Sequence, residues 1–241
     1  MRVAIFTAVF GGYDELKEPP LQDVECDFIC FTDASNAKLE SAWRIVRVPH
    51  DRAVHPRMRA KRYKLMSHEV FPKGRLALRY GRLLAPSSWL TRYDATIWVD
   101  ASLLLRHRSF ARDIVGFIGK TSWAMFTHPD RDCFFEEAIV SSGMNKYRGF
   151  PIREQASHYS KVGILPHSGL YACGVVARKE PLTPMLRRAN ELWWSENVKW
   201  SYQDQLSLPF VLHQLGIGVD QIPGNLWRND WFDWIPRESD C

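Results

Sequence analysis

The order of apolar and polar positions along the chain predicts buried strands that alternate with amphipathic helices. Short apolar runs rich in β-branched and aromatic residues predict strands. We predict strands at residues 2–10, 26–32, 43–48, 89–105, 122–127, 169–177 and 216–222. Helical periodicity and helix end signals predict helices at residues 57–71, 132–142, 154–162, 184–196 and 203–215. This combination indicates the α/β fold class.

The predicted helix at residues 57–71 carries a row of basic side chains. At about 100° per residue, Arg57, Lys61, Lys64 and His68 fall on one helix face. A solvated basic face explains this row, and the pattern alone favours that interpretation. The functional alternative is a cationic stripe that contacts a diphosphate, because the helix leads toward the strand that follows it.

The apolar run at residues 89–105 is interrupted by one carboxylate, Asp100, which we expect at the end of a buried central strand. In open α/β sheets, ligands bind beyond the carboxyl ends of the strands. A turn or capping role is the commoner fate of such an aspartate. The functional alternative is a ligand for Mn²⁺ or Mg²⁺ on a diphosphate. Ser102 stands where an Asp-x-Asp pair would have its second acid, so this metal prediction depends on one carboxylate.

Composition sets broad limits on what the chain can be. Its 241 residues suit one large domain, and 46% hydrophobic with 24% charged residues excludes disorder of the whole. A net charge of +5 suits an enzyme that handles phosphates, and equally a weak nucleic-acid or membrane-surface binder. No run reaches the ~18 apolar residues of a membrane span, and the short apolar start lacks the cleavage site of a signal peptide. Five cysteines without paired spacing predict neither a disulfide framework nor a zinc site, and favour a cytoplasmic protein.

An acidic segment near residue 204 is a candidate for catalysis. Asp204 lies near the start of the predicted helix at 203–215, where a carboxylate is stabilised by the helix dipole, so capping is the simplest interpretation. If this end faces the cleft, Asp204 is the candidate general base and Gln205 a hydrogen-bond partner of the reacting sugar. Glu196 is a second, lower-ranked catalytic candidate. We expect Pro209 to interrupt the helix.

Charged residues gather where the strand at 122–127 meets the next helix, for which we expect Asp132 as the N-cap. This group is His128, Arg131, Glu136 and Glu137. Such residues are usually at the surface. Because the junction falls at the same predicted sheet edge as the central carboxylate, we assign them to the binding of donor or acceptor sugar.

Three tryptophans near the end of the chain, Trp227, Trp231 and Trp234, stand among polar residues. A sugar-stacking platform, a membrane-surface patch and ordinary core are the alternatives, and core is favoured for most of them. The chain contains no GxSxG, Walker or GxGxxG motif, which removes the common hydrolase and nucleotide-binding alternatives.

Several segments together resemble one known family. They are IFTAVFGGYDELKEPP, CFTD, KRYKLMSHEVFP, IWVDAS, HPDRDCFFEEA and WWSENVKWSYQDQLSLPFVL, in this order. The chain is similar to a glycosyltransferase-like family long described as a domain of unknown function, which includes plant Golgi proteins of mucilage synthesis and bacterial proteins of surface-polysaccharide loci. The resemblance implies a single GT-A type domain at residues 1–241, with a mixed, mostly parallel central sheet flanked by helices. It divides the domain into a nucleotide-binding half (1–105) and an acceptor half (106–241).

The resemblance also implies roles for individual residues. Thr7, Ala8 and Tyr13 would line the nucleotide pocket, and Arg57, Lys61 and Lys64 would face the diphosphate. Asp100 would take the place of the metal-binding aspartate, with Ser102 beside it in the donor site. Asp204 and Gln205 resemble the acidic pair near the anomeric carbon of the donor sugar.

The resulting hypothesis is a cytoplasmic glycosyltransferase that moves a sugar from a nucleotide-sugar to a glycan or lipid-linked acceptor in surface polysaccharide assembly, such as lipopolysaccharide or capsule. A divalent cation is its expected cofactor, and peripheral association with the inner face of the membrane is compatible with its charge. Retention or inversion, and the oligomeric state, stay open. The alternatives are an inactive nucleotide- or glycan-binding module and a nucleic-acid binder. We do not expect nucleic acid as a partner, because the basic residues between 52 and 92 are modest in number.

Overall fold

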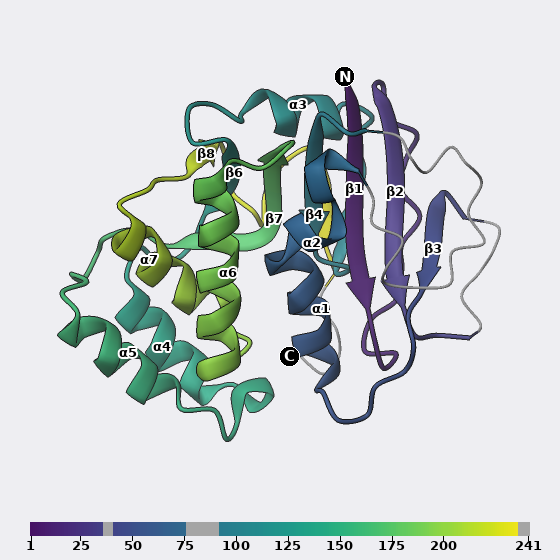
Figure 1. Cartoon of the computed structure of the whole chain (residues 1–241). Coiled ribbons are helices and arrows are strands. Elements are labelled where there is room, and N and C mark those ends of the chain that lie inside the picture. The colour runs from purple at the N-terminus through teal and green to yellow at the C-terminus, as the bar shows by residue number, and fades with distance from the viewer. Residues whose placement is uncertain (36–40, 76–91, 236–241) are drawn as a thin grey trace.

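The computed structural model describes residues 1–35, 41–75 and 92–235. Its strands form a seven-stranded sheet of order β3-β2-β1-β4-β7-β6-β8 and a two-stranded sheet of β5 and β9 (Figure 1). The strand bounds are β1 Arg2–Val9, β2 Glu25–Thr32, β3 Trp43–Arg47, β4 Ala95–Val99, β5 Leu103–Leu105, β6 Trp123–Thr127, β7 Tyr171–Lys179, β8 Asp220–Ile222 and β9 Phe232–Trp234. Each segment predicted as a strand therefore overlaps at least one strand.

The large sheet is mixed and mostly parallel. Within the described residues, β7 runs antiparallel to β4 and β6, whereas the other neighbouring pairs are parallel. Strand β1 is buried along almost its whole length, which explains its unbroken apolar sequence, because parallel strands are covered on both faces. This sheet, flanked by helices, confirms the predicted α/β class and is compatible with a GT-A type arrangement.

The predicted central strand at 89–105 is wrong in its length. Residues 89–91 lie outside the described ranges, and β4 ends at Val99. A turn follows, in which the Leu103 backbone N–H donates to the Asp100 carbonyl at 2.9 Å. The chain then enters β5, which pairs with β9 rather than with the large sheet. The physical reason is local: the polar and small residues at 100–102 favour a turn over extended backbone.

The helices are α1 Pro56–Leu65, α2 Ser67–Val70, α3 Phe110–Gly116, α4 Phe134–Gly143, α5 Ile152–Lys161, α6 Pro184–Lys199 and α7 Asp204–Leu215, with short 3₁₀ turns at Pro72–Gly74 and Asn145–Tyr147. The single helix predicted at 57–71 is broken at Met66, whose φ of −97° and ψ of 39° leave the helical region. Cys133, not Asp132, precedes α4 as its N-cap. Helix α7 continues through Pro209, so the predicted interruption is also wrong.

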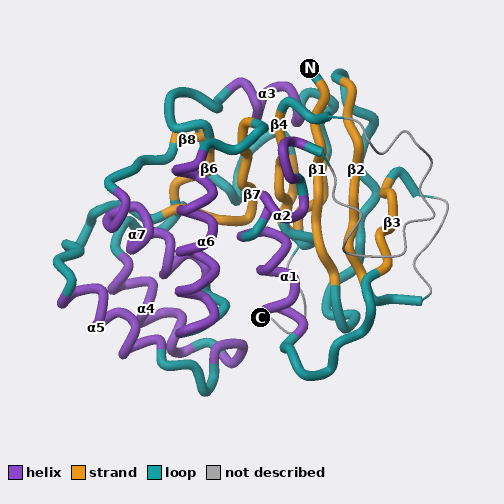
Figure 2. Tube along the Cα trace, viewed as in Figure 1, coloured by secondary structure: helices purple, strands orange, loops and turns teal. Residues whose placement is uncertain are grey.

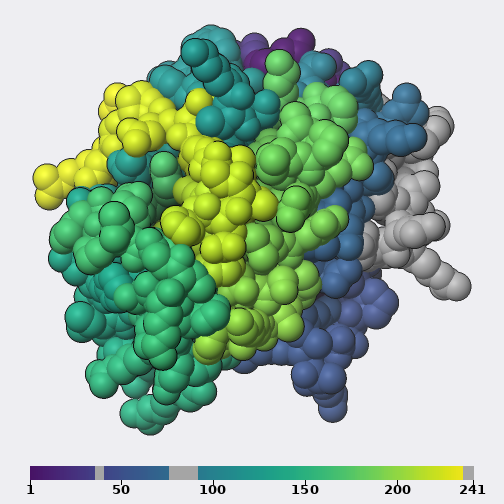
Figure 3. Space-filling model, turned by 60° about the vertical axis from the view of Figure 1, so that its left-hand side comes forward, coloured from purple at the N-terminus to yellow at the C-terminus, as the bar shows by residue number. Residues whose placement is uncertain are grey.

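Two hydrophobic layers cover the sheet, and a third cluster lies beside it. Helices α1, α2, α6 and α7 pack on one face, around residues such as Phe6 and Trp193. Helix α3 and the β5–β9 pair pack on the other face, around Ile97 and Phe110. Figure 2 shows α1 and α6 in purple, running in roughly the same direction as the orange strands. Helices α4 and α5 pack together and against α7 through Tyr159 and its neighbours. Figure 3 shows the teal and green surface of this part of the molecule.

Two further observations concern the described residues alone. None of the helices combines the length and the hydrophobicity that crossing a membrane requires. The four described cysteines, Cys26, Cys30, Cys133 and Cys173, carry free thiols.

Candidate functional site

A cavity of about 450 Å³ opens at the carboxyl edge of the large sheet. Ala8 near the end of β1, Asp100 after β4 and His128 after β6 line it, together with Cys173 near the start of the antiparallel β7. Helices α1, α4 and α7 and the β5–β9 pair supply the remaining walls. The sheet therefore brings strand ends from across the chain to one place, as expected for a ligand site in this fold class.

Most of the predicted site residues meet at this cavity. Its lining includes Ala8, Tyr13, Arg57, Lys61, Lys64, Asp100, Ser102, His128, Arg131, Glu137, Asp204 and Gln205. Three predicted residues, Thr7, Glu136 and Glu196, are described by the structure and lie outside that lining. Their roles as nucleotide, substrate or catalytic contacts receive no support from this placement.

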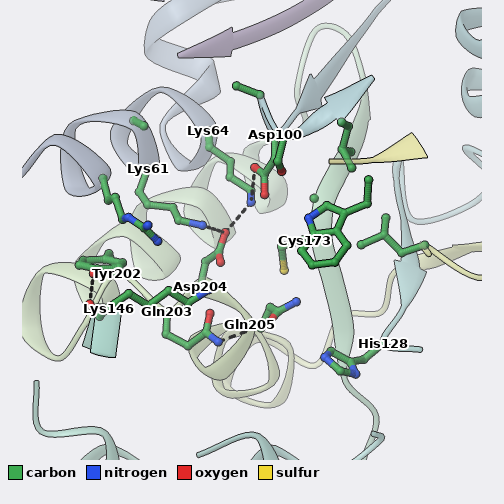
Figure 4. A pocket seen from close by; sticks show the side chains of 18 of the residues that line it. Lys61, Lys64, Asp100, His128, Lys146, Cys173, Tyr202, Gln203, Asp204 and Gln205 are labelled. Atoms are coloured by element: carbon green, nitrogen blue, oxygen red, sulfur yellow. Dashed lines mark hydrogen bonds and ion pairs between the residues drawn. The ribbon is translucent and has the colours of Figure 1, made fainter. Parts of the chain in front are cut away.

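Two aspartates and two lysines form the centre of the site, and their side chains point toward one another (Figure 4). The Lys64 Nζ lies 2.6 Å from Asp204 Oδ2 and 3.4 Å from Asp100 Oδ1. Lys61 Nζ lies 2.7 Å from the same Asp204 oxygen. Lys61 and Lys64 are three positions apart on α1, which places them on one helix face and explains why both reach one carboxylate. The Trp98 indole N–H donates to Asp100 Oδ1 at 2.6 Å.

Burial makes this cluster strongly ionic. The Lys64 side chain is 0% exposed and that of Asp204 is 4% exposed. Burial alone would raise the pKa of Asp204, but attraction to Lys61 and Lys64 outweighs it and lowers this pKa to about 2. Burial alone would lower the pKa of Lys64, but Asp100 and Asp204 outweigh it and raise this pKa. For Lys61, burial prevails over the attraction of Asp204, so its pKa is lowered. At neutral pH, Asp204 and Lys64 are therefore both charged.

This arrangement bears on the expected role of Asp204. A general base works best when its pKa lies near the operating pH. A carboxylate with a pKa of about 2, held by two ammonium groups, is a weak acceptor of protons. The chemistry of Asp204 is better suited to holding the lysines and presenting fixed charge to a ligand.

The donor set around Asp100 does not match that of a divalent cation held by the protein. Among the described residues, no group of three or more histidines, cysteines, aspartates or glutamates is placed to hold a metal. Asp100 Oδ1 already accepts the Trp98 N–H and faces the Lys64 ammonium, a cation in its own right. A divalent cation at Asp100 therefore stays a prediction, and the side chains around Asp100 do not form a suitable set of ligands for it.

A second polar network supports the far end of the cavity. Glu137 is 2% exposed, and its Oε2 accepts from Arg131 Nε at 2.8 Å. Its Oε1 accepts from Gln203 Nε2 at 2.7 Å and from Ser141 Oγ at 2.9 Å. The network joins α4 to the residue just before α7 and so helps to fix the start of that helix.

His128 sits at this end of the cavity as a neutral ring. Burial, followed by the charge of Arg131, lowers its pKa, although Glu137 opposes this shift. Its Nδ1 faces the backbone N–H groups of Asp130 and Arg131, both at 3.2 Å, and therefore accepts from them. The other ring nitrogen, Nε2, lies 3.4 Å from Arg131 Nη2 and 3.7 Å from Glu137 Oε2.

The structure gives physical reasons for the residues that lie elsewhere. Thr7 precedes Ala8 on β1, and successive strand residues face opposite sides of a sheet. Glu136 is exposed on α4, whereas its neighbour Glu137 is buried. Glu196 accepts from the Tyr159 hydroxyl at 2.8 Å and from the Trp200 indole at 3.0 Å, inside the third hydrophobic cluster. His68, predicted to share the basic face, lies on α2 and approaches Glu191 at 3.6 Å.

The tryptophans near the end of the described chain divide between two roles. Trp231 packs against the core on the α3 side of the sheet. Trp227 and Trp234 line the cavity mouth, are 40% and 43% exposed, and lie 4.9 Å apart between ring centroids. Sequence reasoning left these roles open. Strand alternation does not separate Phe232, which is buried, from Trp234, because residues two positions apart on β9 face the same side.

A mixed, mostly parallel sheet with a charged cavity at its carboxyl edge defines a ligand-binding α/β protein. Comparison over the whole chain narrows this class. The family model described as TOD1/MUCI70, glycosyltransferase-like domain, matches residues 1–229, and the chain belongs to this family. The resemblance seen in the sequence is thereby confirmed. No curated protein matches the chain. Membership supports glycosyl transfer at a coarse level, with a sugar donor and an acceptor as the ligands.

Proposed function

We propose that this protein transfers a sugar from a nucleoside-diphosphate sugar to a glycan or lipid-linked acceptor in surface polysaccharide assembly. The observation that carries the proposal is the cationic wall of α1 at the carboxyl edge of the sheet, inside a cavity of about 450 Å³. Arg57, Lys61 and Lys64 all line this wall. Departure of a nucleoside diphosphate builds negative charge, which preorganised cations stabilise.

The donor end of the cavity supplies the groups that such a reaction needs. The Arg57 guanidinium lies 5.5 Å from the Tyr13 ring centroid, so both residues shape the same rim of the cavity. The Lys61 side chain is 18% exposed and can contact a phosphate while Lys64 holds Asp204. Gln205, partly buried beside Asp204, offers an amide to the sugar hydroxyls. In this proposal Asp204 fixes the lysines, and Gln205 orients the sugar.

The acceptor end has a different character. Trp227 and Trp234 present aromatic rings at the mouth, where the apolar face of a sugar ring can stack. Val140 and Met144 of the α4 region line the cavity and are also exposed. This supports a carbohydrate acceptor that enters between the tryptophan pair and α4. The free thiols of the described cysteines support a cytoplasmic location.

A binding module that does not catalyse transfer is the second candidate. The low pKa of Asp204 favours it, because this carboxylate is a poor base for an acceptor hydroxyl. The module would bind nucleotide or glycan in the same cavity. The two candidates differ only in turnover.

A substrate screen tests the proposal. The protein is incubated with nucleotide sugars and short glycans, and released nucleoside diphosphate is measured beside the melting temperature. We expect turnover with at least one pair, and stabilisation by the matching nucleotide. Lys61→Ala should lower turnover and the affinity for the nucleotide about tenfold each, as loss of a charge-assisted contact does. Lys199→Ala, a change at an exposed residue outside the cavity lining, should alter neither.

The outcomes separate the candidates. Nucleotide binding without turnover for any pair supports the binding module. A melting temperature that no nucleotide raises contradicts a donor site in this cavity, and with it the proposed function.

A further inference from the structure

Two carboxylates from distant parts of the chain converge on one ammonium group. Asp100 follows β4, and Asp204 is the first residue of α7. The Lys64 Nζ lies between them, 3.4 Å from Asp100 Oδ1 and 2.6 Å from Asp204 Oδ2 (Figure 4). Oxygen atoms from two separated elements around a single positive charge are the arrangement in which proteins commonly hold Mg²⁺ or Mn²⁺.

The cation in this place belongs to the chain itself. The Lys64 side chain is 0% exposed, so its ammonium group is fixed by its carboxylate partners and not by water. A buried charge is tolerated when it is paired, and removal of one partner leaves the others uncompensated. The raised pKa of Lys64 agrees with an ammonium that stays protonated at neutral pH.

A divalent cation would have to compete with this ammonium. To reach both Asp100 and Asp204, it must take the space that Lys64 Nζ fills. To bind Asp100 alone, it must sit near Lys64 and oppose a like charge at low dielectric. Lys61 adds a second ammonium 2.7 Å from Asp204, which raises the repulsion further.

We propose that the Lys64 ammonium is the resident cation of this site, in place of a divalent metal, and that nucleoside diphosphates bind here without added Mn²⁺ or Mg²⁺. The absence of a second acid at Ser102 fits this assignment, since an ammonium needs fewer oxygen ligands than a divalent cation does. The statement about nucleotides rests on the proposed donor site. The statement about the cation does not.

The first test therefore uses Mn²⁺ alone. Free Mn²⁺ is counted by electron paramagnetic resonance, and the melting temperature is followed with Mn²⁺ or a chelator. The wild-type protein should leave the Mn²⁺ signal unchanged and melt at the same temperature in both conditions. Lys64→Ala should melt lower, deplete free Mn²⁺, and regain several degrees when Mn²⁺ is added, because Asp100 and Asp204 then lack the cation that they share.

Two matched variants locate the effect. Lys64→Ala combined with Asp100→Asn should lose the gained Mn²⁺ response, since one of the two carboxylates is then gone. Lys61→Ala should gain no such response, because Lys64 still fills the site. If Lys64→Ala does not fold, Lys64→Gln provides the same comparison with less loss of volume.

Two results would overturn the inference. One is Mn²⁺ binding by the wild-type protein that disappears in Asp100→Asn, which would place the metal beside Lys64. The other is a folded Lys64 variant that ignores Mn²⁺, which would show that the two carboxylates make no cation site. Neither result depends on finding a nucleotide or a sugar that binds, so failure of the proposed function is recognised separately.

Discussion

Two buried carboxylates near opposite ends of β4 differ in the charges around them. Asp204, at the carboxyl end, is paired with Lys61 and Lys64, and its pKa is lowered to about 2. Glu180, at the amino end, accepts from Thr96 Oγ1 at 3.1 Å, and burial raises its pKa to about 7 despite the attraction of Arg178. Similar burial thus gives opposite shifts, because only Asp204 has ammonium groups in direct contact.

This difference shows which end of the sheet is built for charge. At the carboxyl end, ionised side chains persist in the wall of a cavity. At the amino end, a carboxyl group titrates near neutrality within the packed interior. We therefore expect substitutions at the two ends to change the free energy of unfolding by different amounts and with different pH dependence.

Loss of Asp204 is the largest expected effect. Asp204→Ala removes the carboxylate that Lys61 shares with the fully buried Lys64, and we expect the free energy of unfolding to fall by about 3–5 kcal/mol. Urea unfolding at pH 7 measures it. Asp233→Ala is the control, because Asp233 pairs with Arg106 while both side chains are more than half exposed. That surface pair should contribute about 0–1 kcal/mol. Equal losses in the two variants would refute a buried ionic cluster at α1.

The pH dependence of stability should have opposite signs at the two ends. The folded protein retains the Glu180 proton up to a pKa of about 7, whereas the unfolded chain releases it near 4.5. Stability is therefore lost as pH rises between these values, by on the order of 3 kcal/mol. Asp204 acts oppositely, because its contribution is lost as pH falls from near 3.8 toward 2.

Unfolding measured from pH 4 to pH 8 in the wild type and in Glu180→Gln isolates the first of these contributions. The difference between the two proteins should change with pH in the stated direction, and the variant should be the less pH-dependent one. A constant difference across this range would show that Glu180 titrates normally.

The tryptophan pair gives the smallest expected effect and sharpens the contrast with the buried cluster. Trp227→Ala and Trp234→Ala remove exposed rings, so stability should change little. Each loss of stacking is worth about 1 kcal/mol, which is about fivefold in the KM for the acceptor. Initial rates with varied acceptor measure it, and the KM for the donor should stay constant. A rise in the donor KM alone would assign these rings to the nucleotide instead.

Much of this architecture could be predicted from local sequence signals. Apolar runs located the strands because buried parallel strands need side chains that are apolar on both faces. Helical geometry placed Lys61 and Lys64 on one face because their spacing alone determines it. Ligands bind beyond the carboxyl ends of strands in open α/β sheets, and this predicted that Asp100 and His128, which each follow a strand, would lie at one cavity.

Other features depend on contacts between distant segments. The pattern alone favoured a solvated basic face on α1, but Lys64 is fully buried because α7 brings Asp204 against it. Glu196 carries a carboxylate, as a catalytic acid would, but this group accepts hydrogen bonds from Tyr159 and Trp200 in a hydrophobic cluster. The turn at Asp100 has a local cause, but the pairing of β5 with β9 joins segments that lie far apart along the chain. Spacing in the sequence does not encode these approaches.

The most direct test of the central claim is calorimetric titration of the wild-type protein with nucleoside diphosphates, in chelator and again with Mn²⁺. We predict that at least one nucleotide binds with dissociation constants that agree within about twofold in the two conditions, because Lys61, Lys64 and Arg57 supply the positive charge. Binding that appears only with Mn²⁺ would contradict the assignment of the Lys64 ammonium as the resident cation.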